Sequence, residues 1–476
     1  MKTLLICAVN FMLIYNSLSQ TSFNYIYSSP LSEISRSILE DHDGNLYFSI
    51  ENFQYGLIIK LNNAGKFLDS LRIDNSDGTC NLAELIPFSE TQFVALGTWS
   101  EDSLSQLWYV RFDYDLNIIE ERKLNTEGQF IFSFRHIVNQ NNNIVLMAHY
   151  HKPPAYNMDV CMFELTLEGV LIRSMYFNTS SSFNSGFSVL EDPKNCTYKV
   201  FAKSGLSSRL PYIINVIDTS FNLLYTHYLP YFFIESPGST KWINDSVYTL
   251  SGRRYSLATS EWDIGILKVN RNDSVLASNY FGKPDTVDWS GNYKSHDFIS
   301  KDNIYLAGSS NTYAYPYQQE YSWIMLNVLD SNLGLKHQHF YGGDAFYLVN
   351  TILATQDSGC VLSCSRYDYL TQYNEFDVYI LKVNKDGLMV SVPEEGALDD
   401  PQCRIFPNPG LETVTIVTDD PSQFQLFDLT GRIMFDISLT DKHNLVNVSG
   451  LKSGVYLYRM LGKDSIISCS GKWIKQ

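Results

Sequence analysis

Hydrophobic residues recur along most of the chain as short runs that end at Asn, Asp or Thr and resume after a few polar positions. The runs read IIKLNNAGKFL, YVRFDYDLNII, FELTLEGVLI, NVIDTSFNLL, ILKVNRNDSVL, NVLDSNLGLK and ILKVNKDGLMV. Each run is divided by one Asn, Asp or Thr, called the anchor below, and the anchors recur roughly every fifty positions. They are Asn62, Asp113, Thr166, Asp218, Asn270, Asp330 and Asn384. Three or four positions later come Gly65, Asn117, Gly169, Asn222, Asp273, Gly334 and Gly387. Because Gly, Asn and Asp tolerate the positive φ of a tight hairpin, each run predicts two strands joined by a turn.

A further strand precedes each run, in stretches such as NLYFSI, NIVLMAH and NIYLAGS. No long stretch has convincing helical periodicity, so an all-β chain is expected. About four strands in roughly fifty residues are typical of a propeller blade. Seven such units, spanning approximately residues 35 to 392, predict a seven-bladed β-propeller within residues 20–392. Two alternatives stay open, an eight-bladed ring if FNYIYSS (23–29) contributes strands and an open β-solenoid.

The repeat also resembles a pattern common in exported bacterial propellers, in which DGG-Y, D-x-W-x-x-K and Y-G-G elements follow one another. The matching stretches are SKDNIYLAGSS (300–310), EWDIGILKVNRNDS (261–274) and Phe340-Tyr341-Gly342-Gly343. The resemblance is strongest in units five to seven, and units two to four depart from it. It implies an architecture and no catalytic residues.

Three connections between the second and third strands of a unit are long and aromatic: 149–159, 311–323 and 366–379. Alternate connections of antiparallel strands lie on opposite faces of a propeller, so these loops are expected on one face. Tyr and Trp offer flat apolar area with a polar edge, suited to stacking on sugars or anchoring a protein. The predicted ligand-binding residues are Tyr150, Tyr156, Tyr255, Trp262, Tyr313, Tyr315, Tyr317, Tyr321, Tyr367, Tyr369 and Tyr373. The alternative is that these tyrosines only pack the long hairpins together.

Known catalytic motifs are missing from the sequence, and no cofactor is expected. His149 with His151, and His337 with His339, could each hold a metal, but no third ligand can be assigned, so no metal site is predicted. A non-catalytic glycan- or protein-binding module is the leading hypothesis. The alternatives are a polysaccharide hydrolase or lyase with carboxylates at the ring centre, and a structural surface-layer protein.

The start of the chain predicts export. Residues 1–19 have a positive start at Lys2, an apolar core and a small-residue cleavage pattern, which predicts a signal peptide and no membrane span. A net charge of −16 argues against nucleic acid as a partner.

The cysteines after the predicted signal peptide are scattered along the chain. Cys360 and Cys364 share a strand face and could pair with other cysteines, although disulfides are not expected to frame the fold.

The fifty-residue pattern stops after an acidic, proline-containing linker, PEEGALDDPQ (393–402). Residues 403–476 consist of short alternating runs such as TVTIV, FQLFDL and GVYLYRM with turns at Gly431 and Gly454. Such a set of short strands predicts a small β-sandwich of immunoglobulin-like size.

The ordered motifs of this module resemble the type A sorting domain of the Bacteroidetes type IX secretion system. They are FPNP (406–409), hydrophobic-D-x-x-G-R at 427–432, L-x-x-G-V-Y at 451–456 and a terminal K-x-I-K at 472–475. The residues expected to carry the sorting signal are Pro407, Asn408, Pro409, Gly431, Arg432, Gly454, Tyr456, Lys472 and Lys475. Cys403 and Cys469 depart from the family pattern and could join the first and last strands.

The resemblance implies a route and two partners. The chain would reach the periplasm, be recognised by the type IX translocon, and lose the module to a sorting peptidase. The cargo would then be released or attached to surface lipopolysaccharide, so a secreted or outer-membrane-surface location is expected.

Overall fold

The computed structural model describes residues 21–29, 31–52, 54–101, 104–125, 130–152, 155–177, 184–204, 212–229, 234–256, 261–312, 318–371, 375–389, 403–406, 412–418, 422–428, 430–461 and 467–475. The chain forms two compact units, Met1–Val392 and Pro393–Gln476. Both are built from β-strands, and no helix occurs in the ranges just given. The predicted all-β class is therefore confirmed.

The first unit contains consecutive antiparallel sheets, each formed by neighbouring strands of the chain. The first three are β2 (Ile34–Glu40), β3 (Leu46–Glu51), β4 (Tyr55–Leu61) and β5 (Phe67–Asp74); β6 (Gly78–Ser89), β7 (Gln92–Glu101), β8 (Leu104–Asp113) and β9 (Ile118–Leu124); and β10 (Phe130–Val138), β11 (Ile144–Lys152), β12 (Ala155–Leu165) and β13 (Leu171–Tyr176).

The remaining sheets follow the same order. They are β14 (Asn184–Asp192), β15 (Thr197–Ser204), β16 (Tyr212–Asp218) and β17 (Leu223–Leu229); β18 (Glu235–Asn244), β19 (Val247–Ser256), β20 (Glu261–Asn270) and β21 (Val275–Phe281); β22 (Asp288–Ser290), β23 (His296–Asp297), β24 (Ile304–Ser310), β25 (Trp323–Leu329) and β26 (Leu335–Gly342); and β27 (Phe346–Ala354), β28 (Cys360–Tyr367) and β29 (Asp377–Val383) with β1 (Phe23–Tyr27).

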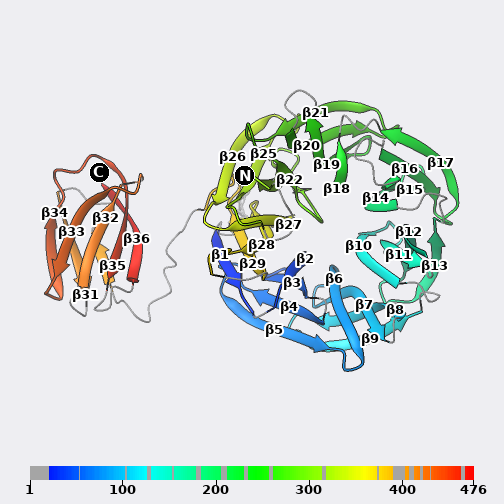
Figure 1. The fold of residues 1–476 in the computed structure, drawn as a ribbon, viewed down its shortest axis with the longest axis horizontal. Coiled ribbons are helices and arrows are strands. Elements are labelled where there is room, and N and C mark those ends of the chain that lie inside the picture. Colours follow the sequence, from blue (N-terminus) through cyan, green and yellow to red (C-terminus); the bar gives the residue numbers. More distant parts are fainter. Residues whose placement is uncertain are drawn as a thin grey trace, which may run out of the picture. The chain divides into compact units, whose positions relative to one another are not determined.

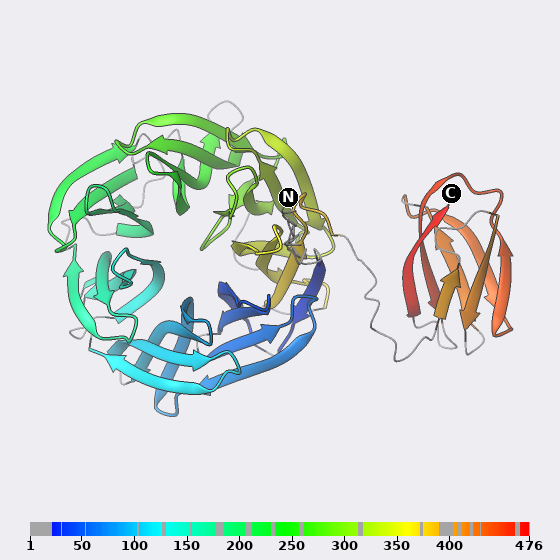
Figure 2. The ribbon, with the colours of Figure 1, turned by 180° about the vertical axis from the view of Figure 1, so that it is seen from behind.

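The sheets stand around a ring, with the first strand of each toward the centre and the last at the outside (Figure 1). Figure 2 shows the same ring from behind. This arrangement is a β-propeller, and it holds seven sheets among the described residues. The FNYIYSS stretch forms β1, which pairs antiparallel with β29 from Phe23 opposite Lys382 to Tyr27 opposite Val378. The stretch therefore completes the last sheet, and within the described residues it adds no further blade.

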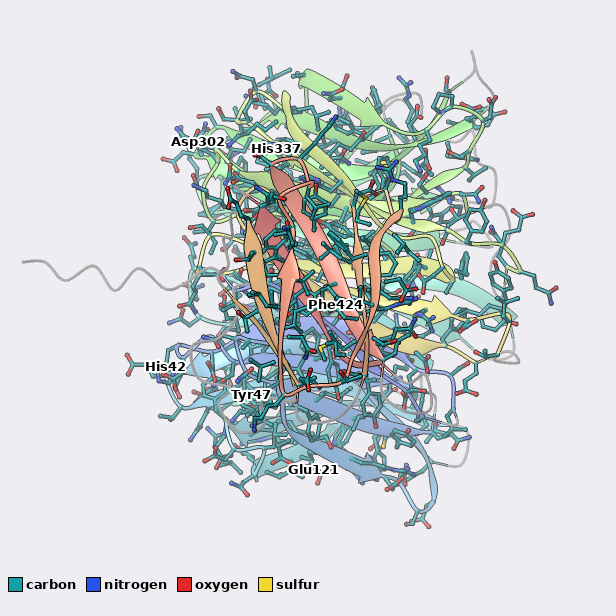
Figure 3. The ribbon with its side chains drawn as sticks, turned by 90° about the vertical axis from the view of Figure 1, so that its left-hand side faces the viewer. His42, Tyr47, Glu121, Asp302, His337 and Phe424 are labelled. Atoms are coloured by element: carbon teal, nitrogen blue, oxygen red, sulfur yellow. The ribbon has the colours of Figure 1, made fainter. Side chains whose placement is uncertain are left out.

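The two faces of the ring carry different connections. The turns from first to second strand share one face with the turns from third to fourth strand. In Figure 3 His42 and Asp302, which lie in two of the former turns, project on the same side. The long aromatic connections belong to the opposite face, as the sequence predicts.

The turns after the third strand confirm the predicted hairpins but correct the position of the strained residue. In the first sheet the Asn62 side chain accepts hydrogen bonds from the backbone N–H groups of Ala64 (3.0 Å) and Lys66 (2.8 Å). Positive φ occurs three positions after the anchor in every turn, at Gly65, Leu116, Gly169, Phe221, Asp273, Leu333 and Gly387. Asn117, Asn222 and Gly334 are therefore not the positive-φ residues. Leu116, Phe221 and Leu333 take that role because their side chains are buried, and burial offsets about 1–2 kcal/mol of backbone strain.

These turns also connect neighbouring blades. Tyr47 and Lys60 of the first sheet donate to the carbonyl of Tyr114 in the second (2.8 and 2.7 Å). The Tyr109 hydroxyl donates to the Leu167 carbonyl of the third sheet at 2.7 Å. Further hydrogen bonds of this kind, hereafter clasps, reach the fifth, sixth and seventh sheets: Lys199 donates to the Arg271 carbonyl, Lys268 to the Ser331 carbonyl and Tyr305 to the Lys385 carbonyl.

Apolar clusters between adjacent sheets form the core. One cluster joins Leu326 and Val328 of β25 to Leu362 of β28 and Leu381 of β29, all fully buried. Burial of such side chains stabilises the fold by about 1.5–3 kcal/mol each. The core therefore lies between blades, which leaves the innermost strands to line the centre.

The second unit is a two-sheet sandwich. One sheet contains β30 (Cys403–Phe406), β31 (Thr413–Thr418) and β34 (His443–Asn447); the other has the order β33 (Ile433–Leu439), β32 (Ser422–Phe427), β35 (Gly454–Leu461) and β36 (Ile467–Lys475). Phe424, Tyr456 and Trp473 pack in its core, which confirms the predicted sandwich.

We expect loss of one clasp to destabilise the chain strongly. The Lys199 ammonium pairs with the Asp273 carboxylate, both nearly fully buried, and the Tyr248 hydroxyl donates to the same carboxylate at 2.8 Å. Lys199→Met leaves that carboxylate buried without its cation, at a cost of about 3–5 kcal/mol. Urea unfolding of the full chain, followed by tryptophan fluorescence, measures the change. Lys194→Met, in an exposed turn of the same sheet, is the control, and equal stability of the two variants would contradict the assignment.

Candidate functional site

The innermost strands enclose a cavity of about 470 Å³ at the centre of the propeller. All seven sheets contribute to its wall. A volume of this size lies in the range of small-molecule sites. The polar side chains that line it are the candidate functional site, hereafter the central cavity.

An irregularity in each inner strand aims side chains into the cavity. The register shifts between Ser35 and Ser37, Leu82 and Glu84, Phe132 and Arg135, Gly186 and Ser188, Glu235 and Ser239, and Val349 and Thr351. In the sixth sheet the interruption is longer, because Ser290 pairs with Gly308 and the next bridge is His296 with Leu306. Bulges of this kind turn a side chain out of the pleat, and they often lie beside active sites.

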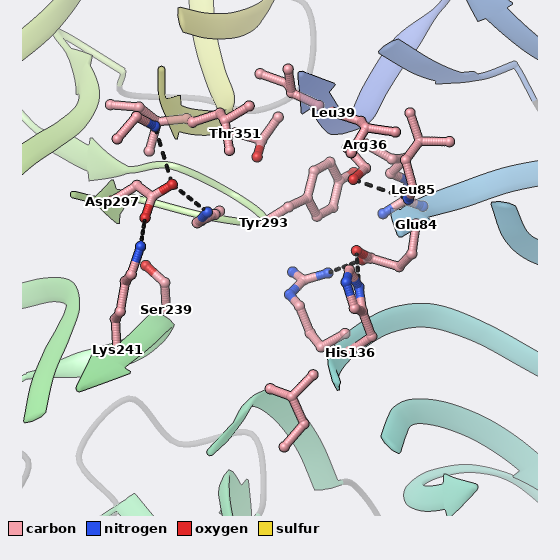
Figure 4. A pocket seen from close by; sticks show the side chains of 18 of the residues that line it. Arg36, Leu39, Glu84, Leu85, His136, Ser239, Lys241, Tyr293, Asp297 and Thr351 are labelled. Carbon is pink, nitrogen blue, oxygen red and sulfur yellow. Dashed lines mark hydrogen bonds and ion pairs between the residues drawn. The ribbon is translucent and has the colours of Figure 1, made fainter. Parts of the chain in front are cut away.

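The interrupting segment of the sixth sheet, residues 291–295, is anchored to the neighbouring blade by its backbone. The N–H of Asn292 donates to the Val349 carbonyl at 3.1 Å, and the N–H of Tyr293 donates to the Asn350 carbonyl at 2.8 Å. Tyr293 then points across the cavity toward Arg36 (Figure 4). The segment thereby places one aromatic ring in a space otherwise lined by strands.

Two guanidinium groups lie against this ring. Arg36 is 4.3 Å from the ring centroid of Tyr293 and Arg135 is 5.0 Å from it. Arg36 is also ion-paired with Glu51, and Arg135 donates to the carbonyls of Phe134 (2.6 Å) and Asn292 (3.1 Å). The nearest carboxylate oxygen to Arg135, on Glu84, is 4.0 Å away. We call Arg36, Arg135 and Tyr293 the guanidinium site.

Glu84 and His136 form a pair beside the guanidinium site. The Nδ1 atom of His136 is 2.8 Å from a carboxylate oxygen of Glu84, and both side chains are largely buried. Figure 4 shows the pair on the same wall as Arg36. The carboxylate fixes the orientation of the imidazole ring, which brings a proton-transfer group to this wall.

A second cluster of charge occupies the other wall of the cavity (Figure 4). The ammonium groups of Lys241 and Lys294 share the buried carboxylate of Asp297, at 2.6 and 2.7 Å. The Ala354 N–H donates to the same carboxylate at 3.1 Å. Both lysine side chains remain more than a third exposed, so two cations with one counter-charge face the cavity.

Several pKa values respond to these surroundings. Burial alone would lower the pKa of Arg36, but the Glu51 carboxylate raises it above its usual range. The pKa of Arg135 is lowered by burial and by the Arg36 cation, against the opposing effect of Glu84. The pKa of Asp297 would rise with burial, yet Lys294 and Lys241 hold it well below its usual range. Burial raises the pKa of Glu40, at the cavity rim, to about 7.

A serine–histidine contact next to the cavity is structural. Nδ1 of the His296 ring lies 2.9 Å from the Ser239 hydroxyl and 2.6 Å from that of Ser251, and Nε2 lies 2.7 Å from the Thr249 hydroxyl. The imidazole is completely buried, and Ser239 is nearly so. Ser239 lines the cavity, but its hydroxyl also accepts hydrogen bonds from the backbone N–H groups of Ser295 (3.2 Å) and His296 (3.1 Å), so the group does not fit a nucleophile.

The aromatic loops are only partly available as a surface. Tyr150 and Tyr367 are buried in the core, Tyr150 against Tyr176 and Tyr367 against Phe376, which is the packing role weighed as the alternative. Their prediction as ligand-binding residues is therefore not supported by exposure. The side chains of Tyr156, Tyr313, Tyr315, Tyr317 and Tyr373 lie outside the described residues.

The other aromatic residues of this face form two pairs and one half-buried side chain. Tyr255 and Trp262 lie 5.1 Å apart between ring centroids, with Arg253 over the Trp262 ring at 4.6 Å. Tyr321 is about half exposed, at 48%, and meets Trp323 edge to face. Tyr369 is half-buried beside Tyr367. These residues are not brought together in one cavity with the guanidinium site.

The histidines and cysteines singled out in the sequence take part in packing or lie outside the described residues. Nε2 of His339 lies 2.9 Å from the Asp386 carbonyl, and its ring stacks on that of His337. Within the described ranges no three side chains of the His, Cys, Asp and Glu types form a metal site. Cys360 and Cys364 are buried free thiols, so the suggested pairing of these residues is wrong. The side chains of Cys403 and Cys469 and the predicted signal peptide lie outside the described residues.

The sorting-signal residues lie at two turns and along the last strand pair. The Asp428 carboxylate accepts from the N–H of Arg432 at 3.1 Å, Gly431 has a φ of 81°, and Arg432 is exposed. In β35 and β36, Gly454 is opposite Lys475, Tyr456 is opposite Trp473 and Leu457 is opposite Lys472. Tyr456 is a core residue whose hydroxyl donates to the Lys452 carbonyl at 2.8 Å. Pro407, Asn408 and Pro409 lie outside the described residues.

Comparison with known families assigns the second unit. Residues 404–476 match the family of the secretion system C-terminal sorting domain. The chain is thus a cargo of type IX secretion with a β-propeller body, and this domain implies secretion or a cell-surface location. In the described part of the chain, no helix is long and apolar enough to cross a membrane. No curated protein matches the chain.

Solved structures similar to the propeller are distant. A catalytically inactive virginiamycin B lyase from Staphylococcus aureus has 10% identity and a TM-score of 0.41, covering 76% of this chain and 99% of that one. The β-propeller domain of the Trilobed protease from Pyrococcus furiosus has 10% identity and a TM-score of 0.41, covering 77% and 98%. Polysaccharide lyase Uly1 has 10% identity and a TM-score of 0.42, covering 78% and 95%. Similarity this low carries no inference about chemistry.

Sequence reasoning considered the ring centre only for the alternative hydrolase or lyase and assigned no residue to it, because it looked for ligand residues in loops. A signal was present in the first strand of five repeats, where charged or histidine residues stand shortly before a hydrophobic pair. These residues are Arg36, Glu84, Arg135, His136, Lys241 and Asp297. Their convergence follows only from closing the ring.

Acid is expected to destabilise the wall behind the cavity through His296. Burial lowers its pKa from 6.5 to about 3, so between these values the unfolded chain binds a proton that the folded chain does not. Stability therefore falls as the pH drops below about 6.5, by about 2 kcal/mol from pH 7 to pH 5. Urea midpoints at both pH values should differ less in His296→Gln than in the unchanged chain. Exposed His42→Gln is the control, and an unchanged pH dependence in His296→Gln would contradict the prediction.

Proposed function

We propose that this chain is a secreted or cell-surface binding protein whose central cavity holds a glycan. The observation that carries the proposal is the placement of Tyr293 across a cavity of about 470 Å³, between charged side chains from several blades. A flat ring with polar donors around it suits a sugar, which presents C–H groups on one face and hydroxyls at its edge. On export we expect the sorting domain to be removed, as the resemblance implies.

The size of the cavity favours a glycan over a folded protein partner. A standard protein interface needs about 800 Å² on each partner, over some 20–30 residues. A concave site of this volume instead encloses a ligand of one or a few sugar rings. The partly exposed aromatic residues Tyr255, Trp262, Tyr321 and Tyr369 remain a proposed accessory surface on the ring face.

A polysaccharide lyase is the second candidate, and one observation favours it. Tyr293 lies between two guanidinium groups and near the Glu84–His136 pair. In a lyase reaction one group removes a proton next to a sugar carboxylate and another donates a proton to the leaving oxygen, and the Tyr293 hydroxyl and His136 are placed for these two roles.

We expect Tyr293→Ala to weaken glycan binding by about tenfold or more, because it removes the only aromatic ring among the cavity residues described above. A glycan array with the full chain identifies the ligand, and calorimetry compares the variants. Tyr225→Ala, exposed on the outer strand β17, is the matched control. Equal affinity of Tyr293→Ala and the unchanged chain would contradict the site. Breakdown of the bound glycan that is lost in Tyr293→Phe would support the lyase instead.

Deletion of residues 404–476 should leave the protein in the periplasm. The sandwich that these residues form carries the family match, and the propeller has its own core. Cell fractionation and immunoblotting measure the location. Arg432→Ala in the full chain, at an exposed side chain of the motif, should reduce export without unfolding the sandwich. Normal appearance of the truncated chain outside the cell would refute the sorting role.

A further inference from the structure

The central cavity has more positively charged side chains than its own carboxylates can pair with. Lys241 and Lys294 share one carboxylate, that of Asp297. Arg135 has no carboxylate closer than 4.0 Å, and that one, on Glu84, is 2.8 Å from His136. Glu40 is the other acidic residue of the lining, and burial raises its pKa to about 7. The cavity thus presents cations in a chain whose net charge is −16.

The guanidinium site holds two like charges close to one ring. Arg36 and Arg135 are 4.3 and 5.0 Å from the Tyr293 centroid, and each cation lies near enough to affect the other. Glu51 pairs with Arg36 from behind, where the Asn81 amide also donates to it at 3.0 Å. Like charges held together are costly unless an anion joins them. An anionic group bound beside Arg36 and Arg135 would therefore be stabilised by both cations.

One donor of this site is left unsatisfied. Within the described part of the chain, Nε of Arg135 is buried and has no hydrogen-bond partner. A buried N–H without an acceptor costs about 1–3 kcal/mol. That nitrogen has almost no accessible surface, so a ligand in the cavity meets Arg135 through the exposed part of its guanidinium group, the side chain being 19% exposed. Guanidinium groups match the two oxygens of a carboxylate.

We propose that the central cavity binds a saccharide whose ring carries a carboxylate, with the carboxylate at Arg36 and Arg135 and the sugar ring against Tyr293. The inference rests on the proposed function, since it names the ligand class of the same site. The lysine pair on the opposite wall then meets a second acidic unit of the same oligosaccharide. A neutral glycan would leave Arg135 with no carboxylate closer than 4.0 Å and the two lysines with only the one carboxylate that they share.

Calorimetry with the full chain tests the ligand class. The probes are an oligogalacturonate and the same oligomer after reduction of its carboxyl groups to alcohols. We expect the acidic oligomer to bind about tenfold to a hundredfold more tightly, and its affinity to fall as the salt concentration rises. Equal affinities would overturn the inference while leaving glycan binding intact. Binding of neither oligomer, with no hit on a neutral glycan array, would instead overturn the proposed function.

Substitutions locate the carboxylate. Arg135→Gln should remove most of the preference for the acidic oligomer, so that the affinity for this oligomer falls toward that for the reduced one. Arg122→Gln, on the outer strand β9, is the matched control. If near-ultraviolet circular dichroism shows that Arg135→Gln is unfolded, Lys294→Gln at the partly exposed second cluster makes the same comparison. A full preference retained in folded Arg135→Gln and in Lys294→Gln would overturn the assignment.

Discussion

The propeller depends on hydrogen bonds that side chains of one blade donate to the outer turn of the next at most of the junctions. Tyrosine and lysine side chains from second and third strands donate to backbone carbonyls of these turns, as Tyr47 and Lys60 do to Tyr114. A carbonyl in a turn has no strand partner, so a donor from the neighbouring blade satisfies it and fixes the angle between blades. The clasp from Lys199 adds a buried ion pair with Asp273. Such contacts orient sheets that apolar packing alone would allow to slide.

The ring is closed by strand pairing and hydrogen bonding where the last sheet meets the first. The β1 strand joins β29, and the Gln356 N–H donates to the Glu40 carboxylate at 2.8 Å, across the junction of the last and first sheets. Once the ring is closed, the inner strands are held at a set distance from the axis. Their bulges then turn Arg36, Glu84 and Arg135 into a shared space. The cavity is a product of closure, and its chemistry comes from irregularities in the strands.

The site combines two features with separate origins. The segment 291–295 interrupts the sixth inner strand and delivers Tyr293, while the first and third sheets supply the arginines that lie against it. Fully buried His296 and Asp297 stabilise the base of that segment. The result is a rigid wall carrying polar groups, which is the condition for selective binding of a polar ligand. The sorting domain has its own core and needs none of these contacts.

Much of this organisation could be read from local sequence. The recurrence of Asn62, Asp113 and their counterparts determined the repeat, because an Asx side chain accepting two backbone N–H groups closes the hairpin wherever it occurs. The motifs around Gly431 and Gly454 likewise determined the module and its destination. The sequence did not show which residue of each turn has a positive φ, since Leu116 and Phe221 adopt it because their side chains are buried against other segments. The packing role of Tyr150 and Tyr367 could not be predicted either, because the exposure of a side chain depends on which other segments pack over it. Only the tertiary structure decided the site, because Arg36, Arg135 and Tyr293 come from three blades and meet only when the ring is closed.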